Sequence, residues 1–192
     1  QWIGQPDTFV WIGLRVPDLE ELTAAVDACG ADVHDVAELL QPHDRPVFAT
    51  HDHTTSLVLR TAHIDDTDGT VLLGELTVLI GSDYVISVRH GEASPLSATR
   101  AHLEAHPDEM RFGPPAVLAA ITEQVIVDYG PVLDRLERDA IDIEREVLDD
   151  IDRKPVRRLY RLKRELREFT TATDALDDPM ERLIRAERGV WP

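Results

Sequence analysis

In the first half of the chain, short runs of mainly apolar residues are separated by polar segments. Four runs rich in Val, Ile, Leu and Thr have the length and composition of β-strands, at residues 9–14, 54–62, 72–80 and 84–89. Gly81-Ser82-Asp83, between the last two runs, predicts a tight hairpin turn. These residues therefore predict a β-sheet.

Three predicted helices lie between or after these strands. Apolar residues recur three or four positions apart after Asp18, a good N-cap residue, and Gly30 is suited to end that helix. A second short helix is expected at residues 33–40, stopped by Pro42. Ser94-Pro95 predicts the start of a third helix that ends near residue 105.

The second half of the chain is helical in pattern. Steps of three or four connect apolar positions from Leu118 to Val147, which indicates one long amphipathic stretch. Pro131 lacks the N–H that a helix interior needs, so we expect a kink or break at residues 127–131. A further amphipathic helix is predicted from Lys154-Pro155 onward, with a kink at Pro179.

Together these elements predict an α/β fold. We expect a mixed β-sheet flanked by α-helices, followed by a long antiparallel helical hairpin. The division falls between an α/β sheet domain at residues 1–112 and the helical hairpin at residues 113–192.

The distribution of charge supports the predicted hairpin, and the net charge argues against one class of binding partner. Residues 123–152 contain eleven acidic residues and three Arg, whereas residues 153–168 contain eight basic and two acidic residues. Two helices of opposite charge with apolar stripes favour antiparallel pairing. The net charge of −17 argues against nucleic acid as a partner, because DNA binding requires Lys and Arg to neutralise phosphates.

The sequence lacks the signals that are typical of several classes of protein. We expect no membrane-spanning helix within the chain and no signal peptide at its start. A single cysteine, Cys29, rules out an intrachain disulfide. No nucleophile motif, phosphate-binding glycine loop or paired-carboxylate motif is present, so we do not expect an enzyme.

Six segments in order resemble one family of transport proteins. They are 9–14, Pro42-His43-Asp44-Arg45-Pro46, Gly74-Glu75-Leu76-Thr77-Val78-Leu79-Ile80-Gly81, Val88-Arg89-His90-Gly91-Glu92, the acidic helix 121–148 with Val127-Asp128-Tyr129, and Leu162-Lys163-Arg164. The chain thereby resembles the cytoplasmic domain of CorA-type magnesium/cobalt transporters over essentially its whole length. Asp44 stands where the family more often has Gln.

The resemblance implies a regulatory role. The family's cytoplasmic α/β domain leads through a long stalk helix to two membrane spans, with a Gly-Met-Asn motif at the pore entrance that this chain lacks. Its members are homopentamers regulated by Mg²⁺ bound between neighbouring cytoplasmic domains. We therefore expect a domain at the cytoplasmic face of the cell membrane that senses Mg²⁺, with Co²⁺ as the alternative ion, and gates a pore formed elsewhere. Its expected partners are divalent cations and other copies of itself.

Two glutamates match the family's regulatory acids. Glu38 corresponds to the acid in the helix before the His-Arg-Pro turn, and Glu123 to an acid in the long helix. The family more often has Asp at both positions, and Ala37 occupies the place of a further acid. Mg²⁺ keeps several waters and needs only one or two carboxylates. The sequence thus predicts Glu38 and Glu123 as metal ligands.

The sequence leaves two alternatives open. The related zinc-transporting branch has the same architecture, and two histidine pairs offer zinc ligands: His51 with His53 on one strand face, and His102 with His106 on one helix face. Two ligands alone do not make a structural zinc site. The other alternative is a soluble adaptor that binds a protein through the charged hairpin.

Overall fold

The computed structural model describes residues 8–31, 33, 36–41, 43, 45–51, 53–91, 96–149 and 156–187. In this part of the chain five strands form one sheet in the order β1-β5-β4-β3-β2. The strands are β1 (Val10–Arg15), β2 (Val47–His51), β3 (Thr54–Ile64), β4 (Val71–Ile80) and β5 (Tyr84–Gly91). β1 lies parallel to β5 and the other neighbours are antiparallel, so the predicted mixed sheet is confirmed.

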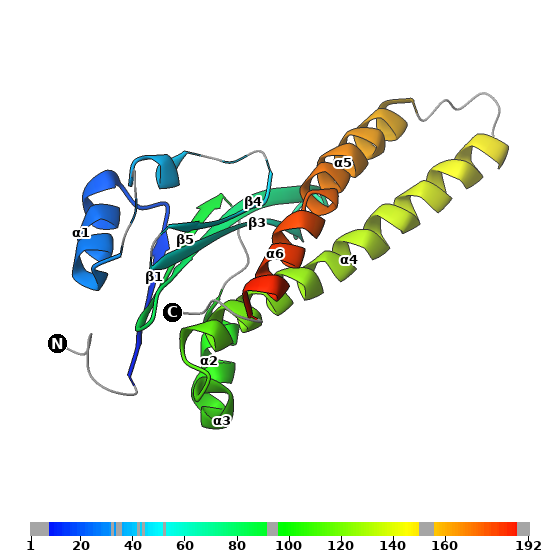
Figure 1. The fold of residues 1–192 in the computed structure, drawn as a ribbon. Coiled ribbons are helices and arrows are strands. Elements are labelled where there is room, and N and C mark those ends of the chain that lie inside the picture. The colour runs from blue at the N-terminus through cyan, green and yellow to red at the C-terminus, as the bar shows by residue number, and fades with distance from the viewer. Residues whose placement is uncertain are drawn as a thin grey trace.

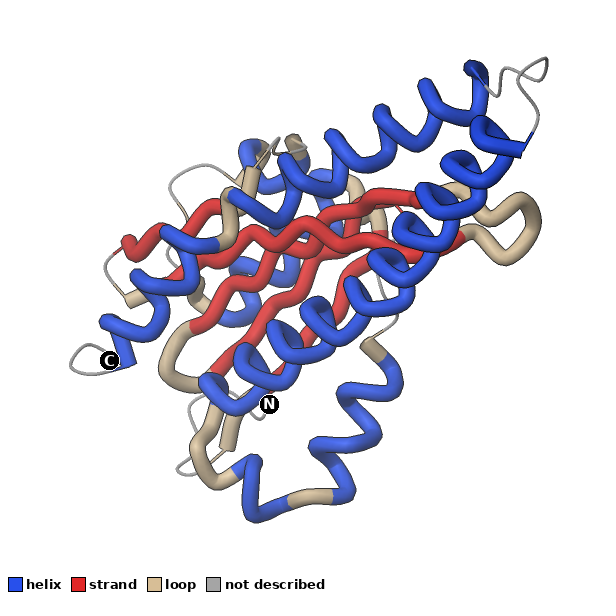
Figure 2. The backbone as a smooth tube through the Cα atoms, turned by 90° about the vertical axis from the view of Figure 1, so that its right-hand side faces the viewer, coloured by secondary structure: helices blue, strands red, loops and turns tan. Residues whose placement is uncertain are grey.

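Helices cover both faces of the sheet (Figure 1). On one face lie α1 (Leu19–Cys29) and the short 3₁₀ helix η1 (Glu38–Leu40). The other face carries α2 (Ser97–Ala105), α3 (Pro107–Met110), α4 (Pro114–Asp149), α5 (Val156–Asp174) and α6 (Asp177–Glu187). Figure 2 shows the long helices of this second layer lying across the strands.

Alternation along the strands produces two separate cores. On β4, Leu76 and Val78 face the α4 layer together with Leu118 and Ile121 of that helix. Leu79 faces the α1 layer and packs with Leu22. Because side chains alternate along a strand, one strand contributes to both cores and is buried on both sides.

The predicted termini of α1 are confirmed. Asp18 accepts a hydrogen bond from the backbone N–H of Glu21 at 2.8 Å, and the Glu21 carboxylate accepts one from the Asp18 N–H at 3.4 Å. This reciprocal pair is a capping box. Gly30 ends the helix in the left-handed conformation, with φ of 61°. The predicted turn at residues 81–83 is also present, and a Cβ at Gly81 would collide with the Tyr84 ring.

One helix prediction and one strand-face prediction in the first half need correction. Residues 36–40 form only a turn and the 3₁₀ helix η1, because a single buried residue, Leu39, anchors this segment. His51 ends β2 while His53 lies in the turn that follows, so the two do not share a strand face. Some predicted helix boundaries lie outside the described residues, namely Pro42, Ser94-Pro95 and Lys154-Pro155.

Of the kink or break predicted at residues 127–131, the break is wrong. α4 continues through Pro131 without interruption. Both Pro131 and Val127, whose carbonyl loses its helical donor, lie on the exposed side of the helix, where water can solvate that carbonyl. The buried residues Tyr129 and Val132 meanwhile hold the helix against the sheet.

α5 lies along α4 and forms with it the predicted antiparallel hairpin, which projects beyond the sheet (Figure 1). The predicted kink at Pro179 is a separation into two helices, since α5 ends at Asp174 and α6 starts at Asp177. Pro179 then lies in the first turn of α6, where its missing N–H costs little.

Candidate functional site

Glu38 begins η1 and is exposed to solvent, whereas the next residue, Leu39, is buried in the α1-side core. With the other described residues the Glu38 side chain makes no hydrogen bond or ion pair. It lines a cavity of about 130 Å³ on the face of β2, β3 and β4, together with His43 and His51. The Thr77 hydroxyl, fully buried and without a partner among the described residues, also lines this cavity.

The segment that carries Glu38 is attached to the sheet by a buried carboxylate. Glu75 of β4 is 1% exposed. It accepts hydrogen bonds from the backbone N–H of His43 at 2.6 Å and from His43 Nδ1 at 3.0 Å. Arg60 of β3 donates to the same carboxylate at 3.4 Å and to the His43 carbonyl at 3.1 Å. The charge of Glu75 is thus paired and hydrogen-bonded, as burial of a carboxylate requires.

A second histidine also holds η1 against the sheet. His90 Nε2 of β5 lies 3.2 Å from the carbonyl oxygen of Leu39. That oxygen can only accept, so the ring nitrogen donates. His43, Glu75 and His90 all come from segments that resemble the transporter family, and together they position Glu38.

Sequence reasoning did not identify Glu75 as a positioning residue. The available signal was a carboxylate inside an otherwise apolar strand, between Gly74 and Leu76. A charge at such a position predicts a buried partner. The register between β3 and β4 pairs Arg60 with Glu75, whereas the contact with His43 depends on where the loop after η1 lies against the sheet.

Glu123 lies on α4 and is exposed. Its helix packs on the sheet through Leu118, Ile121 and Val125, which face the opposite direction. Because α4 and η1 cover opposite faces of the sheet (Figure 1), the structure does not bring Glu38 and Glu123 together within one chain.

Arg60 connects the two faces. Its side chain binds the His43 loop on the α1 side, while its carbonyl oxygen accepts a hydrogen bond from the Tyr129 hydroxyl of α4. Burial raises the pKa of Tyr129 to about 12. The hydroxyl therefore stays protonated and donates throughout the physiological range.

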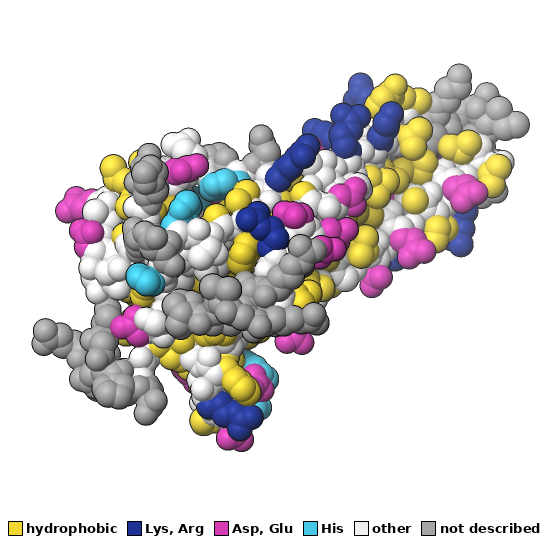
Figure 3. Space-filling model, viewed as in Figure 1, with side chains coloured by type: hydrophobic (Ala, Val, Ile, Leu, Met, Phe, Trp, Pro, Cys, Tyr) yellow, Lys and Arg dark blue, Asp and Glu magenta, His cyan; other side chains and the backbone are white. Residues whose placement is uncertain are grey.

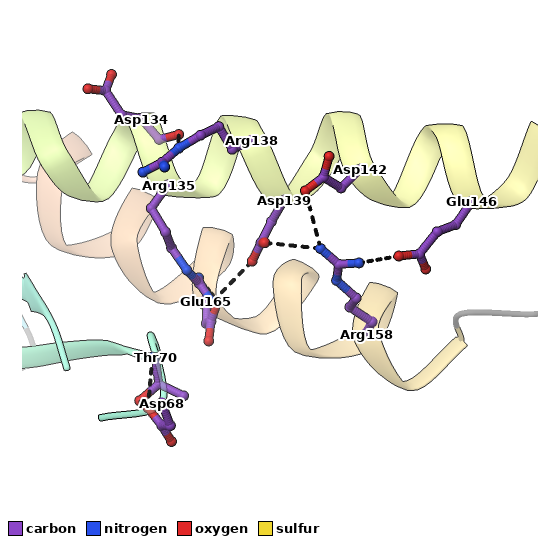
Figure 4. A network of polar contacts seen from close by, with 10 residues as sticks. All are labelled: Asp68, Thr70, Asp134, Arg135, Arg138, Asp139, Asp142, Glu146, Arg158 and Glu165. Carbon is purple, nitrogen blue, oxygen red and sulfur yellow. Dashed lines mark hydrogen bonds and ion pairs between the residues drawn. The ribbon is translucent and has the colours of Figure 1, made fainter. Parts of the chain in front are cut away.

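The α4–α5 hairpin carries a network of ion pairs (Figure 4). Arg158 of α5 lies 3.3 Å from Asp139 and 3.7 Å from Asp142, and also binds Glu146. Arg135 of α4 lies 3.0 Å from Asp139 and binds the buried Glu165 of α5. Arg158 is thus paired with acids of α4, as the opposite charges of the two helices predict. Other basic side chains of α5 remain on the outer surface, as Figure 3 shows.

In the polar loop between β3 and β4, two carboxylates accept hydrogen bonds from residues of the same loop. The hydroxyl and backbone N–H of Thr67 donate to Asp65, and those of Thr70 donate to Asp68. These hydrogen bonds lower the pKa of both carboxyl groups. The two acids thus stabilise the loop.

The sequence predicts no membrane-spanning helix, but α4 has the length and composition of one. Among the described residues, Pro114–Leu148 of α4 is long and apolar enough, by length and composition, to cross a membrane. The core helix of a globular domain passes the same test. Here Leu118, Ile121 and Val132 of this helix are buried in the sheet core.

Solved structures share this fold at low sequence identity. The full-length CmaX protein matches with a TM-score of 0.75 and 17% identity, over 98% of this chain and 57% of CmaX. The soluble domain of CorA from Methanocaldococcus jannaschii matches with a TM-score of 0.71 and 18% identity, over 96% of this chain and 72% of that domain. The ZntB cytoplasmic domain from Vibrio parahaemolyticus matches with a TM-score of 0.66 and 16% identity, over 92% of this chain and 69% of that domain.

The chain therefore spans little more than half the length of CmaX. No curated protein matches the sequence. The sequence profile described as CorA-like Mg²⁺ transporter protein matches residues 6–192. That match covers nearly the whole chain, and the chain belongs to the CorA-like family of Mg²⁺ transporter proteins.

Proposed function

We propose that this chain is the cytoplasmic regulatory domain of a divalent-cation transporter and has no catalytic activity. It senses Mg²⁺, with Co²⁺ as the alternative ion, through Glu38 and Glu123, and controls a pore that other segments of the protein form in the cell membrane. Support comes from membership of the CorA-like family over residues 6–192.

The observation that carries the proposal is the placement of the two carboxylates. Both are exposed and make no ion pair with the other described residues, so both are available to a cation. They lie on opposite faces of the sheet. In a closed ring of identical subunits, each interface joins two different surfaces. A homopentamer can therefore bring Glu38 of one subunit toward Glu123 of its neighbour, although one chain alone cannot.

The chemistry fits a regulatory ion. Two carboxylates that face each other between subunits repel, and Mg²⁺ with its retained waters relieves that repulsion. Loss of the ion at low Mg²⁺ then loosens the ring and favours the open pore. This is a population shift driven by different ion affinities of the two states.

The attachments of η1 give the sensor a rigid base. Glu75 and His90 hold the segment around Glu38 from two strands, and Arg60 joins that segment to α4. A force on Glu38 from a bound ion is thereby transmitted to the sheet and to the helix that carries Glu123.

The test compares Mg²⁺-dependent stabilisation of the full-length protein. We expect added Mg²⁺ to raise the melting temperature of the wild type and to have little effect on a Glu38→Gln, Glu123→Gln variant. A matched control replaces two other exposed acids of α4 in Glu137→Gln, Glu144→Gln, which removes the same charge. An equal Mg²⁺ response in all three proteins would contradict the proposal.

Zn²⁺ is a second candidate for the transported ion. The similarity to the ZntB cytoplasmic domain favours it, and the similarity to the CorA soluble domain favours Mg²⁺. Ion flux through the full-length protein, measured separately with Mg²⁺, Co²⁺ and Zn²⁺, distinguishes the candidates. A third reading, a freestanding adaptor, predicts no flux of any of these ions.

A further inference from the structure

The corner between α2 and α3 brings three metal-binding side chains together. His102 lies near the end of α2, His106 between the two helices, and Glu109 in α3. One ligand atom from each residue lies within 4.8 Å of the other two. All three residues are exposed, and Figure 3 shows His and acidic side chains next to each other at this corner.

The distance between two of these ligands suits a zinc ion. His102 Nε2 lies 3.3 Å from Glu109 Oε2. In a tetrahedral site with bonds of about 2.0–2.1 Å, neighbouring ligand atoms lie about 3.3–3.4 Å apart. The imidazole and the carboxylate therefore lie close enough to become two ligands of one ion.

The third ligand is oriented by the backbone. His106 Nδ1 lies 2.7 Å from the carbonyl oxygen of His102. A carbonyl only accepts, so Nδ1 carries the proton and Nε2 keeps a free lone pair. Zinc-binding histidines commonly donate their second ring N–H to a carbonyl in this way.

One adjustment is needed before all three ligands can bind one ion. The rings of His102 and His106 are stacked, with centroids 4.2 Å apart and planes 29° apart. The lone pair of a ring nitrogen lies in the ring plane, so one ring must turn about its side-chain bonds. The His102 side chain is 53% exposed, and little packing opposes that rotation.

We propose that His102, His106 and Glu109 bind one Zn²⁺ ion, with water in the remaining coordination position. Two imidazole ligands favour Zn²⁺ over Mg²⁺, which prefers oxygen ligands in an octahedral arrangement. The bound ion would connect α2 to α3 and fix the corner that leads through Gly113 into α4. This site shares no residue with the proposed Mg²⁺ sensor, so either proposal can fail without the other.

The experiment measures Zn²⁺ binding by titration calorimetry on the chelator-treated protein, with the absorption spectrum of bound Co²⁺ as a second readout. We expect the wild type to bind one Zn²⁺ and to show the strong absorption of tetrahedral Co²⁺. The His102→Ala, His106→Ala variant should lose at least about tenfold in affinity, and Glu109→Gln should also bind more weakly. All three side chains are exposed, so circular dichroism of the metal-free variants should match the wild type.

The matched control is His51→Ala, His53→Ala, which removes the other exposed histidine pair. It should bind Zn²⁺ like the wild type. Unchanged affinity in the His102→Ala, His106→Ala variant would overturn the proposal, and so would loss of the site in the control. Displacement of Zn²⁺ by equimolar Mg²⁺ would also contradict the assigned ligand chemistry.

Discussion

The carboxylate of Glu75 binds His43 twice, through the backbone N–H at 2.6 Å and through ring Nδ1 at 3.0 Å. The two residues are 32 positions apart and belong to different segments that resemble the transporter family. Their contact attaches the loop after η1 to the centre of the sheet. Glu75 therefore contributes to stability and to the position of the proposed ligand Glu38.

Replacement of Glu75 by Ala should destabilise the fold strongly. Arg60 and the His43 N–H would lose their buried partner, which costs roughly 3 kcal/mol of unfolding free energy for a broken buried ion pair. Urea unfolding measures this loss. Glu137→Ala, at an exposed position of α4, is the control and should change stability by less than about 0.5 kcal/mol. A similar, small loss in both variants would show that Glu75 does not anchor the loop.

Tyr129 makes stability depend on alkaline pH. A tyrosine in the unfolded chain ionises near its ordinary pKa of 10.0, whereas burial raises the pKa of Tyr129 to about 12. The folded state therefore holds this proton more tightly. The resulting stabilisation is fully present below pH 10 and is lost as the pH rises through the folded pKa of about 12.

The Tyr129→Phe variant isolates this effect. Near neutral pH it should be less stable than the wild type by about 1 kcal/mol, because the hydrogen bond to the Arg60 carbonyl is lost. As the pH rises from 10 toward 12 the difference should shrink and then reverse, which denaturant unfolding at several pH values will show. Tyr160→Phe, at a residue that is 68% exposed, should show no such trend. A pH-independent difference for Tyr129→Phe would refute the assignment.

The two arginines of the hairpin should differ in their effect on stability. Arg135→Ala leaves the buried carboxylate of Glu165 without its cation, which should cost roughly 3 kcal/mol. Arg158→Ala breaks contacts to half-exposed acids and should cost about 1 kcal/mol or less, decreasing with added salt. Chemical unfolding at low and high salt separates the two cases. Equal, salt-sensitive losses would mean that Glu165 is solvated in solution.

Pro131 should be a position where the fold can be stabilised. It is exposed and lies inside a continuous helix, where Pro is about 3 kcal/mol less favourable than Ala. We expect Pro131→Ala to raise the unfolding free energy by about 1–3 kcal/mol, because Ala restores the N–H that the Val127 carbonyl lacks. Thermal unfolding provides the measurement. Gly130→Ala, the adjacent exposed position, should stabilise by no more than about 1 kcal/mol. A destabilised Pro131→Ala variant would show that the proline is required for the path of α4.

Strand and helix positions were largely predictable from local pattern, and the errors have identifiable causes. Runs rich in Val, Ile, Leu and Thr defined β3, β4 and β5, and the residues around Asp18 and Gly30 defined α1. β2 was not predicted as a strand, because only the first three of its five residues 47–51 are apolar. Local propensity at Pro131 predicts a kink or break, but packing of Tyr129 and Val132 on the sheet keeps the helix continuous.

For the proposed sites, too, the sequence determined some features and the tertiary structure determined others. The sequence alone provided the residue types, the family resemblance and the acidic positions Glu38 and Glu123, since these depend on local composition and order. Only the tertiary structure placed those two acids on opposite faces, paired Glu75 with His43, and brought Glu109 to His102. Contacts of this kind depend on strand register and on the angle between helices, which distant residues determine through packing. The sequence pattern predicts which side chains face a core, but it does not predict which side chains contact each other.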